Sequence, residues 1–129
     1  MNIYVDSSAL VKIVVEEAES LALARYLAGL PGDNRLTAAI TRTELIRAVA
    51  RRGGAVENAH SALARLNFVA VTNSVLDAAT EIGPAELRTL DAIHLAAAMS
   101  VPDLRALVTY DSRLAEAASA AGLAVVAPA

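Results

Sequence analysis

Four acidic residues stand where their carboxylates could act together: Asp6, Glu44, Asp91 and Asp111. Asp6 and Asp111 directly follow short apolar runs, Glu44 lies in the first turn of a helical pattern behind another run, and Asp91 opens a strongly apolar segment. Carboxylates at close range raise one another's pKa strongly unless a cation compensates them. Mg²⁺ or Mn²⁺ suits a site made of oxygen ligands. Such an ion lowers the pKa of a bound water and stabilises an in-line phosphoryl displacement, so we expect a metal-dependent enzyme of phosphate chemistry.

Each acid taken alone also has a structural interpretation. Asp6 and Asp111 occupy the position of a helix N-cap, for which Asp is a preferred residue. Thr41 and Glu44 have the spacing of a capping box, in which the glutamate reaches back to the N-cap backbone. Asp91 would meet the positive end of a helix dipole. Both roles stay open for each acid, and only their joint arrangement favours a metal site.

Five short apolar runs alternate with helical patterns, which predicts a parallel α/β sheet with helices on both faces. The runs predict strands at 3–5, 36–40, 68–71, 106–109 and 124–126. Helices are expected at 9–15, 20–30, 41–52, 55–66, 75–82, 89–99 and 113–121, with a cap at 73–74 before the fifth helix. Ligands of such sheets bind outside the carboxyl ends of the strands. We therefore expect the four acids at one edge of the sheet, with Asp91 facing inward.

Other polar residues lie near the acids in the sequence. His94 is interpreted as a partly buried structural histidine, with a ligand or proton-transfer role as the alternative. Arg47 is placed either to pair with Glu44 one helical turn away or to hold a substrate phosphate. The same two roles are open for the arginines beside the other acids, Arg88 and Arg113.

Composition excludes several classes of function. The chain has no cysteine, which excludes disulfides, thiol catalysis and thiolate metal sites. Its net charge of -3 argues against charge-driven nucleic-acid binding over the whole surface, but ten of its eleven basic residues are arginine, so a local basic rim is compatible. One Phe and three Tyr offer few platforms for base stacking. No stretch has the character of a signal peptide or a membrane span, so we expect a cytoplasmic protein without a membrane partner.

The segments around the acids resemble those of a known family. IYVDSSALVK, TRTELIRA, LRTLDAIHLAAA, LVTYDSRLAEAA and GLAVVAP occur in this order. Together they are similar to the PIN-domain ribonucleases, and among these to the VapC toxins of bacterial and archaeal toxin–antitoxin operons. The resemblance runs essentially end to end and predicts one PIN domain over residues 1–129. It implies a three-layer, Rossmann-like α/β fold, with a five-stranded parallel sheet of order 3-2-1-4-5 flanked by helices.

The resemblance also implies an activity and partners. The activity is endonucleolytic cleavage of RNA by metal-activated water, with Mg²⁺ or Mn²⁺ as cofactor. Asp6, Asp91 and Asp111 would hold metal directly or through water, and Glu44 would be a metal or water ligand that orients the nucleophile. Asp111 corresponds to the acid whose role varies most. Family members form homodimers, and a small antitoxin docks on the toxin and blocks its acidic pocket, for which residues 9–15 and 20–30 are candidate contacts.

Three alternative assignments differ in what they require of the sequence. A receiver domain needs paired acids after the first strand and a lysine after the fifth, but here one acid follows the first strand and the single lysine is Lys12. A haloacid-dehalogenase-type phosphatase begins with D-x-D, and Ser8 occupies the second of these positions. A non-catalytic PIN-like module that binds RNA or protein stays open, although the intact set of acids disfavours it.

Overall fold

The computed structural model describes all 129 residues and is built around one five-stranded parallel sheet of order β3-β2-β1-β4-β5, as predicted. The strands are β1 (Asn2–Val5), β2 (Asn34–Ala38), β3 (Asn67–Val69), β4 (Leu104–Val108) and β5 (Val125–Val126). The helices are α1 (Ser7–Val14), α2 (Ser20–Ala28), α3 (Thr41–Arg51), α4 (Val56–Leu63), α5 (Asn73–Thr80), α6 (Thr89–Met99) and α7 (Ser112–Ala120). Every predicted strand and helix is present, with ends that differ from the prediction by at most three residues.

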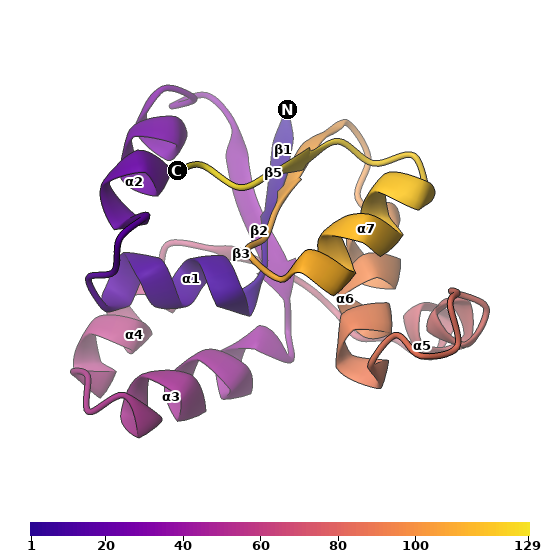
Figure 1. Cartoon of the computed structure of the whole chain (residues 1–129), viewed down its shortest axis with the longest axis horizontal. Helices are drawn as coiled ribbons and strands as arrows, with labels where there is room; N and C mark the ends of the chain where they lie inside the picture. Colours follow the sequence, from indigo (N-terminus) through magenta and orange to yellow (C-terminus); the bar gives the residue numbers. More distant parts are fainter.

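Helices cover both faces of the sheet and give the molecule three layers (Figure 1). Helices α1 to α4 pack on one face, and α5 to α7 pack on the other. Each face has its own apolar core, because alternate residues of a strand point to opposite sides. Ile3 and Val5 of β1 join the core beneath α1 to α4, whereas Tyr4 joins the core beneath α5 to α7.

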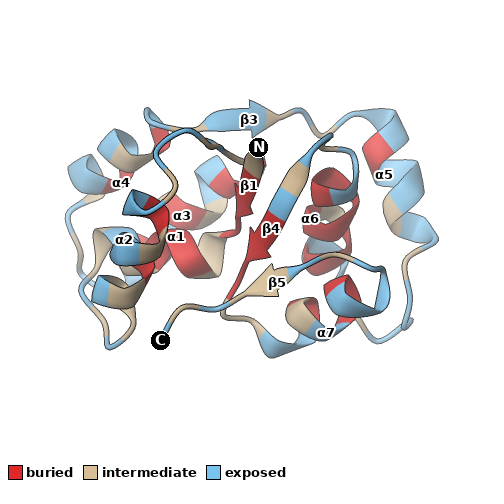
Figure 2. Cartoon of the chain, turned by 90° about the horizontal axis from the view of Figure 1, so that it is seen from above, coloured by how far each residue is buried: buried red, intermediate tan, exposed pale blue.

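Strand β1 is the centre of the sheet and lies between β2 and β4, parallel to both. Its residues 3–5 have no exposed surface, and most of β1 has the colour of buried residues in Figure 2. Burial on both faces explains why this strand is continuously apolar. The register pairs Val5 with Val108, and the Asp6 N–H donates to the Val108 carbonyl at 3.2 Å. The two chain segments that follow β1 and β4 therefore leave the sheet side by side.

Helix α3 has no capping box, so the capping interpretation of Thr41 and Glu44 is wrong. The N-cap residue is Ile40, whose backbone is already in the right-handed helical region, and no side chain caps the helix. Thr41 is a buried helical residue whose hydroxyl bonds that of Thr37 on β2 at 2.7 Å. Because Thr41 lies inside the helix and is turned toward the sheet, Glu44 has no cap to complete and its side chain is available elsewhere.

Helix α5 also begins differently from the prediction. Its N-cap is Thr72 rather than the expected Asn73–Ser74. Thr72 has the extended backbone that an N-cap requires, and its hydroxyl accepts the Val75 N–H at 3.2 Å. The capping chemistry is therefore as expected, but it is displaced by one residue.

Helix α6 is the most deeply buried helix, as its red colour in Figure 2 shows, and four of its buried residues are alanines. It packs against β2, α5 and α7. This burial carries two polar side chains inward, because Asp91 is 7% exposed and His94 is 2% exposed. The predicted inward orientation of Asp91 is confirmed, and His94 is buried almost completely rather than partly. None of the helices combines the length and the hydropathy that crossing a lipid bilayer requires.

Candidate functional site

All four predicted acids line one cavity at the carboxyl edge of β1 and β4. This cavity, the acidic cavity, has a volume of about 340 Å³. His94 and Arg88 line it as well. A larger cavity of about 790 Å³ continues from it along α3 and shares five of its residues: Ser7, Ser8, Glu44, Arg88 and Leu90. The topology therefore brings together acids that lie far apart in the sequence.

Asp6 follows the end of β1, and both of its carboxylate oxygens accept hydrogen bonds. As predicted from its position, it is the N-cap of α1 and accepts the Ala9 N–H at 3.0 Å. It also accepts the hydroxyls of Ser8 and Thr109, each at 2.6 Å. Burial raises the pKa of Asp6, and these hydrogen bonds act in the opposite direction. The capping role and the place in the cavity coexist, so neither interpretation of Asp6 excludes the other.

Two hydroxyls tie the ends of β1 and β4 together behind Asp6. Ser8 Oγ accepts the Tyr110 N–H at 2.9 Å, and Thr109 Oγ1 accepts the Asp111 N–H at 3.1 Å. Each hydroxyl thus donates to Asp6 and accepts from the backbone after β4. These bonds set the separation between the two acids that follow the strands.

Asp111 is also an N-cap, as predicted. Its Oδ1 accepts the Arg113 N–H at 2.9 Å and the Leu114 N–H at 3.1 Å, which caps α7. Its Oδ2 is left for the cavity, where it meets the guanidinium of Arg88. One carboxylate oxygen therefore stabilises the helix, and the other is available to a cation.

Arg88 bridges two of the four acids. Its Nε donates to Asp91 Oδ2 at 2.9 Å, and its Nη2 donates to Asp111 Oδ2. These contacts, led by the hydrogen bond to Asp91, raise the pKa of Arg88. Its side chain is nevertheless 60% exposed, so the guanidinium reaches the acids from the solvent side. Arg88 is thus a counter-ion to two of the acids, which confirms the ion-pairing role that was one of its two predicted alternatives.

Glu44 is held by His94 and not by Arg47. Its Oε1 lies 2.6 Å from His94 Nε2, whereas Arg47 makes no ion pair. His94 Nδ1 lies 2.7 Å from Tyr4 Oη, which accepts the Ala38 N–H at 3.1 Å. Because a carboxylate can only accept, the Glu44 contact places a proton on His94 Nε2, and in the neutral imidazole Nδ1 is then the acceptor for the Tyr4 hydroxyl. The sequence carries no sign of this pairing, because no local pattern connects residues from two different helices.

The oxygen donors of the acidic cavity suit a hard divalent cation, since four carboxylates face it. In the present arrangement, no group of three or more His, Asp or Glu side chains comes close enough to share one ion. In this arrangement Arg88 pairs with Asp91 and Asp111, and His94 pairs with Glu44. Arg88 thus bonds Oδ2 of Asp91 and of Asp111, which are two of the candidate metal ligands.

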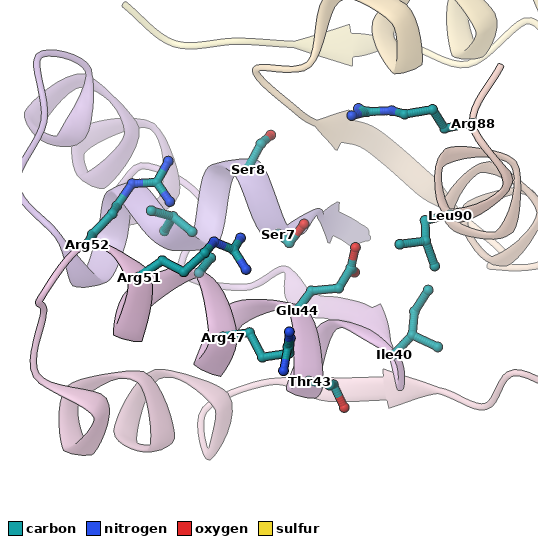
Figure 3. A pocket seen from close by; sticks show the side chains of 12 residues that line it. Ser7, Ser8, Ile40, Thr43, Glu44, Arg47, Arg51, Arg52, Arg88 and Leu90 are labelled. Atoms are coloured by element: carbon teal, nitrogen blue, oxygen red, sulfur yellow. The ribbon is translucent and has the colours of Figure 1, made fainter. Parts of the chain in front are cut away.

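The larger cavity is bordered by arginines, as Figure 3 shows. Arg47, Arg51 and Arg52 come from α3 and its C-cap, and Arg88 stands across from them. Arg113 is not part of this group and lines a separate cavity with Pro84 and Glu116. Of the arginines considered as phosphate ligands, Arg47 and Arg88 are thus placed beside the acids, and Arg113 is not.

Known proteins resemble this chain in sequence and in fold. A family model described as PIN domain matches residues 3–120. Ribonuclease VapC46 of Mycobacterium tuberculosis is 48% identical over 128 residues, which cover 98% of this chain and 97% of that protein. Ribonuclease VapC35 of the same species is 50% identical over 132 residues, which cover 98% of this chain and 96% of that protein.

Two solved structures share the fold at low sequence identity. The crystal structure of Mycobacterium tuberculosis VapC20, described as a Sarcin-Ricin loop cleaving toxin, gives a TM-score of 0.76 at 22% identity and covers 98% of this chain and 99% of that one. VapBC2 from Rickettsia felis, solved with a DNA fragment from the promoter, gives a TM-score of 0.72 at 15% identity, covering 98% of each chain. These two likenesses concern the fold alone.

Proposed function

This chain belongs to the PIN domain family, in its VapC branch, and from this premise we propose that it is a metal-dependent endoribonuclease toxin inhibited by a cognate antitoxin. The observation that carries the proposal is the convergence of Asp6, Glu44, Asp91 and Asp111 on one cavity. Relatives with 41–50% identity over nearly their whole length are named ribonucleases. RNA is therefore the proposed substrate.

Mg²⁺ or Mn²⁺ is the proposed cofactor, held by the oxygens of Asp6, Asp91, Asp111 and Glu44. A divalent cation among these oxygens would supply an acidified water and charge stabilisation for the phosphodiester. Arg88 occupies Oδ2 of Asp91 and of Asp111 and would give these atoms up when the cation binds. Its guanidinium would then be free to hold a non-bridging oxygen of the substrate phosphate.

The neighbours of the acids would orient them for the reaction. Asp6 is fixed by Ser8, Ala9 and Thr109, so its carboxylate keeps one orientation. Glu44 accepts the His94 N–H at Oε1 and makes no other hydrogen bond, which leaves Oε2 to orient the attacking water or accept its proton. His94 is proposed as a positioning residue, because it touches Glu44 and Tyr4 while its side chain is almost wholly buried.

A cognate antitoxin and a second copy of the chain are the proposed partners. The structural neighbour named VapBC2 supports the first of these, a complex with an antitoxin. On this chain, Ile13 of α1 and Leu21 of α2 are apolar side chains that are 45% and 61% exposed. They support the proposal that the first two helices contact a partner.

Cleavage of a total-RNA pool by purified protein tests the proposed function. Discrete fragments are expected with Mg²⁺ or Mn²⁺ and not with excess EDTA, and Asp6→Asn and Asp91→Asn should both abolish them. Asp77→Asn, an exposed acid outside the cavity, is the matched control and should leave cleavage unchanged. Folded, antitoxin-free protein that cleaves nothing would favour the alternative, a non-catalytic module that binds RNA or protein. Cleavage that persists in both active-site variants would show that the assigned site is wrong.

A further inference from the structure

The large cavity along α3 has a feature that the proposed chemistry does not use. Arg47, Arg51 and Arg52 line it, all three are exposed, and none makes an ion pair or a hydrogen bond to another residue through its side chain. Three uncompensated positive charges within six residues of one helix repel one another, in a chain whose net charge is -3. A favourable helix dipole accounts in part for Arg51 and Arg52 at the C-terminal end of α3, but not for Arg47.

These arginines follow Glu44 along one face of α3. Residues three or four apart on a helix are neighbours on its surface, so Arg47 stands one turn and Arg51 two turns beyond Glu44. Figure 3 shows Glu44 and the three arginines facing the same cavity. The row therefore begins at the acidic cavity and leads away from it along the helix.

We infer that Arg47, Arg51 and Arg52 form a binding track for the phosphate backbone of single-stranded RNA, next to the cleavage site. This inference rests on the proposed function, since a strand whose reacting phosphate lies among the acids continues past Glu44 into the larger cavity. Arginine is the side chain best suited to phosphate, because its guanidinium can bind two oxygens at once.

The lining of the cavity indicates which part of the strand is recognised. Its apolar residues are Val11, Ile40, Ala48 and Leu90, and no aromatic side chain lines it. Single-strand binders that grip bases use aromatic platforms. The track therefore binds charge along the backbone and contributes affinity rather than base preference.

The salt dependence of RNA binding tests the track without any cleavage. Binding of a fluorescent single-stranded RNA with 2′-O-methyl sugars would be measured by anisotropy in EDTA, between about 50 and 200 mM salt. Each phosphate contact to a single strand contributes about 0.7 to the slope of log K against log salt, so R47A/R51A/R52A should reduce the slope by about 2. R47K/R51K/R52K keeps the charges and should keep most of the slope.

A charge-matched control separates the track from the overall charge of the chain. R25A/R65A/R113A removes three exposed arginines outside the two cavities and should leave the slope close to that of the wild type. A slope that R47A/R51A/R52A leaves unchanged, or that the control reduces equally, would overturn the inference. Binding of poly-L-glutamate would be measured with the same variants. If R47A/R51A/R52A weakens the binding of poly-L-glutamate but not the binding of RNA, the surface binds an acidic protein segment instead, and the inference is wrong.

The same preparations separate this inference from the proposed function. If the wild type cleaves RNA with Mg²⁺ but its RNA binding does not depend on the three arginines, the proposed nuclease activity is supported and the binding track is contradicted. If the wild type binds RNA through the three arginines but never cleaves it, the binding track is supported and the proposed nuclease activity is contradicted. Folding of each variant would be confirmed by its thermal melting curve.

Discussion

His94 Nε2 lies 2.6 Å from Glu44 Oε1, although the two residues are 50 positions apart in the sequence. The bond continues a buried chain of contacts that starts at the Ala38 N–H and passes through Tyr4 Oη. Strand β1, helix α6 and helix α3 are thereby connected at the point where Glu44 enters the acidic cavity. The polar network beneath the site therefore contributes to the stability of the fold and to the orientation of one of the four acids.

Tyr4→Phe should lower the free energy of unfolding by about 1–3 kcal/mol, because it leaves buried hydrogen-bonding groups without a partner. The groups concerned are the Ala38 N–H and His94 Nδ1. Urea denaturation followed by circular dichroism measures the change. Tyr26→Phe is the control, since the Tyr26 hydroxyl makes no hydrogen bond to another residue, and it should change the stability little. Equal stability of Tyr4→Phe and the wild type would contradict the assigned network.

Asp6→Asn and Asp6→Ala should affect stability differently in the metal-free protein. Burial raises the pKa of Asp6, so the ionised carboxylate is destabilised in the fold, and a neutral Asn can still cap α1 through its amide oxygen. Its NH2 group cannot accept the Thr109 hydroxyl as Oδ2 does, so relief of the buried charge and loss of this hydrogen bond offset each other, and the melting temperature should stay close to that of the wild type. Asp6→Ala loses the cap and should cost about 0.5–2 kcal/mol. Chemical denaturation in EDTA compares the two. A large loss of stability in Asp6→Asn would mean that the charge itself is structural, which would weaken its assignment to the site.

Arg88→Ala should lower the concentration of Mn²⁺ needed to stabilise the protein, by several-fold. Arg88 occupies oxygens of Asp91 and Asp111 that the proposed cation would use, so the guanidinium and the cation compete for them. The measurement is the rise in melting temperature as Mn²⁺ is added. Asp91→Asn should suppress this rise with or without Arg88. Identical Mn²⁺ midpoints for wild type and Arg88→Ala would show that no competition exists.

Asp33 should make stability depend on pH in the acid range, away from the candidate site. The Arg105 guanidinium, helped by the N-terminal amine, lowers the pKa of Asp33 to about 2. Because this lies below the value of about 3.9 for an unfolded Asp, its stabilising contribution is complete above that value and is lost as the pH falls toward about 2. Denaturation of wild type and Asp33→Asn across this range should show a stability difference that shrinks with falling pH. A constant difference would contradict the shift.

Local signals in the sequence were sufficient for much of the architecture. The apolar run at 3–5 and the Asp that follows it predicted a buried central strand with an N-capped helix behind it, and both are present. Asp111 after β4 was predicted by the same logic. The strand order followed from the resemblance to PIN domains and is confirmed. The metal ion, the homodimer and the cytoplasmic location remain predictions.

The predicted N-cap residues of α3 and α5 were wrong, because the backbone conformation selects a neighbouring residue as the N-cap. Thr41 matches a capping pattern, but the backbone of Ile40 before it is already helical, and the Thr41 hydroxyl bonds that of Thr37 instead of a backbone N–H. A capping pattern specifies residue types and spacing, whereas the N-cap also requires an extended backbone that the preceding strand imposes. Glu44 could be recognised as a candidate acid from its own position in the chain, whereas its partner His94 lies on another helix and has no local signal that connects the two.

What the sequence determined by itself was therefore the periodicity of the strands and helices and the N-caps at Asp6 and Asp111, because these depend on residues close together in the chain. Tertiary structure alone decided three features of the site residues: His94 as the partner of Glu44, Arg88 as the partner of Asp111, and the absence of a carboxylate partner for Arg47. The first pairing depends on how α3 and α6 pack against opposite faces of the sheet, and the second depends on how the start of α6 lies beside the start of α7. Side-chain contacts between separate elements follow from that packing, which no spacing within one segment encodes.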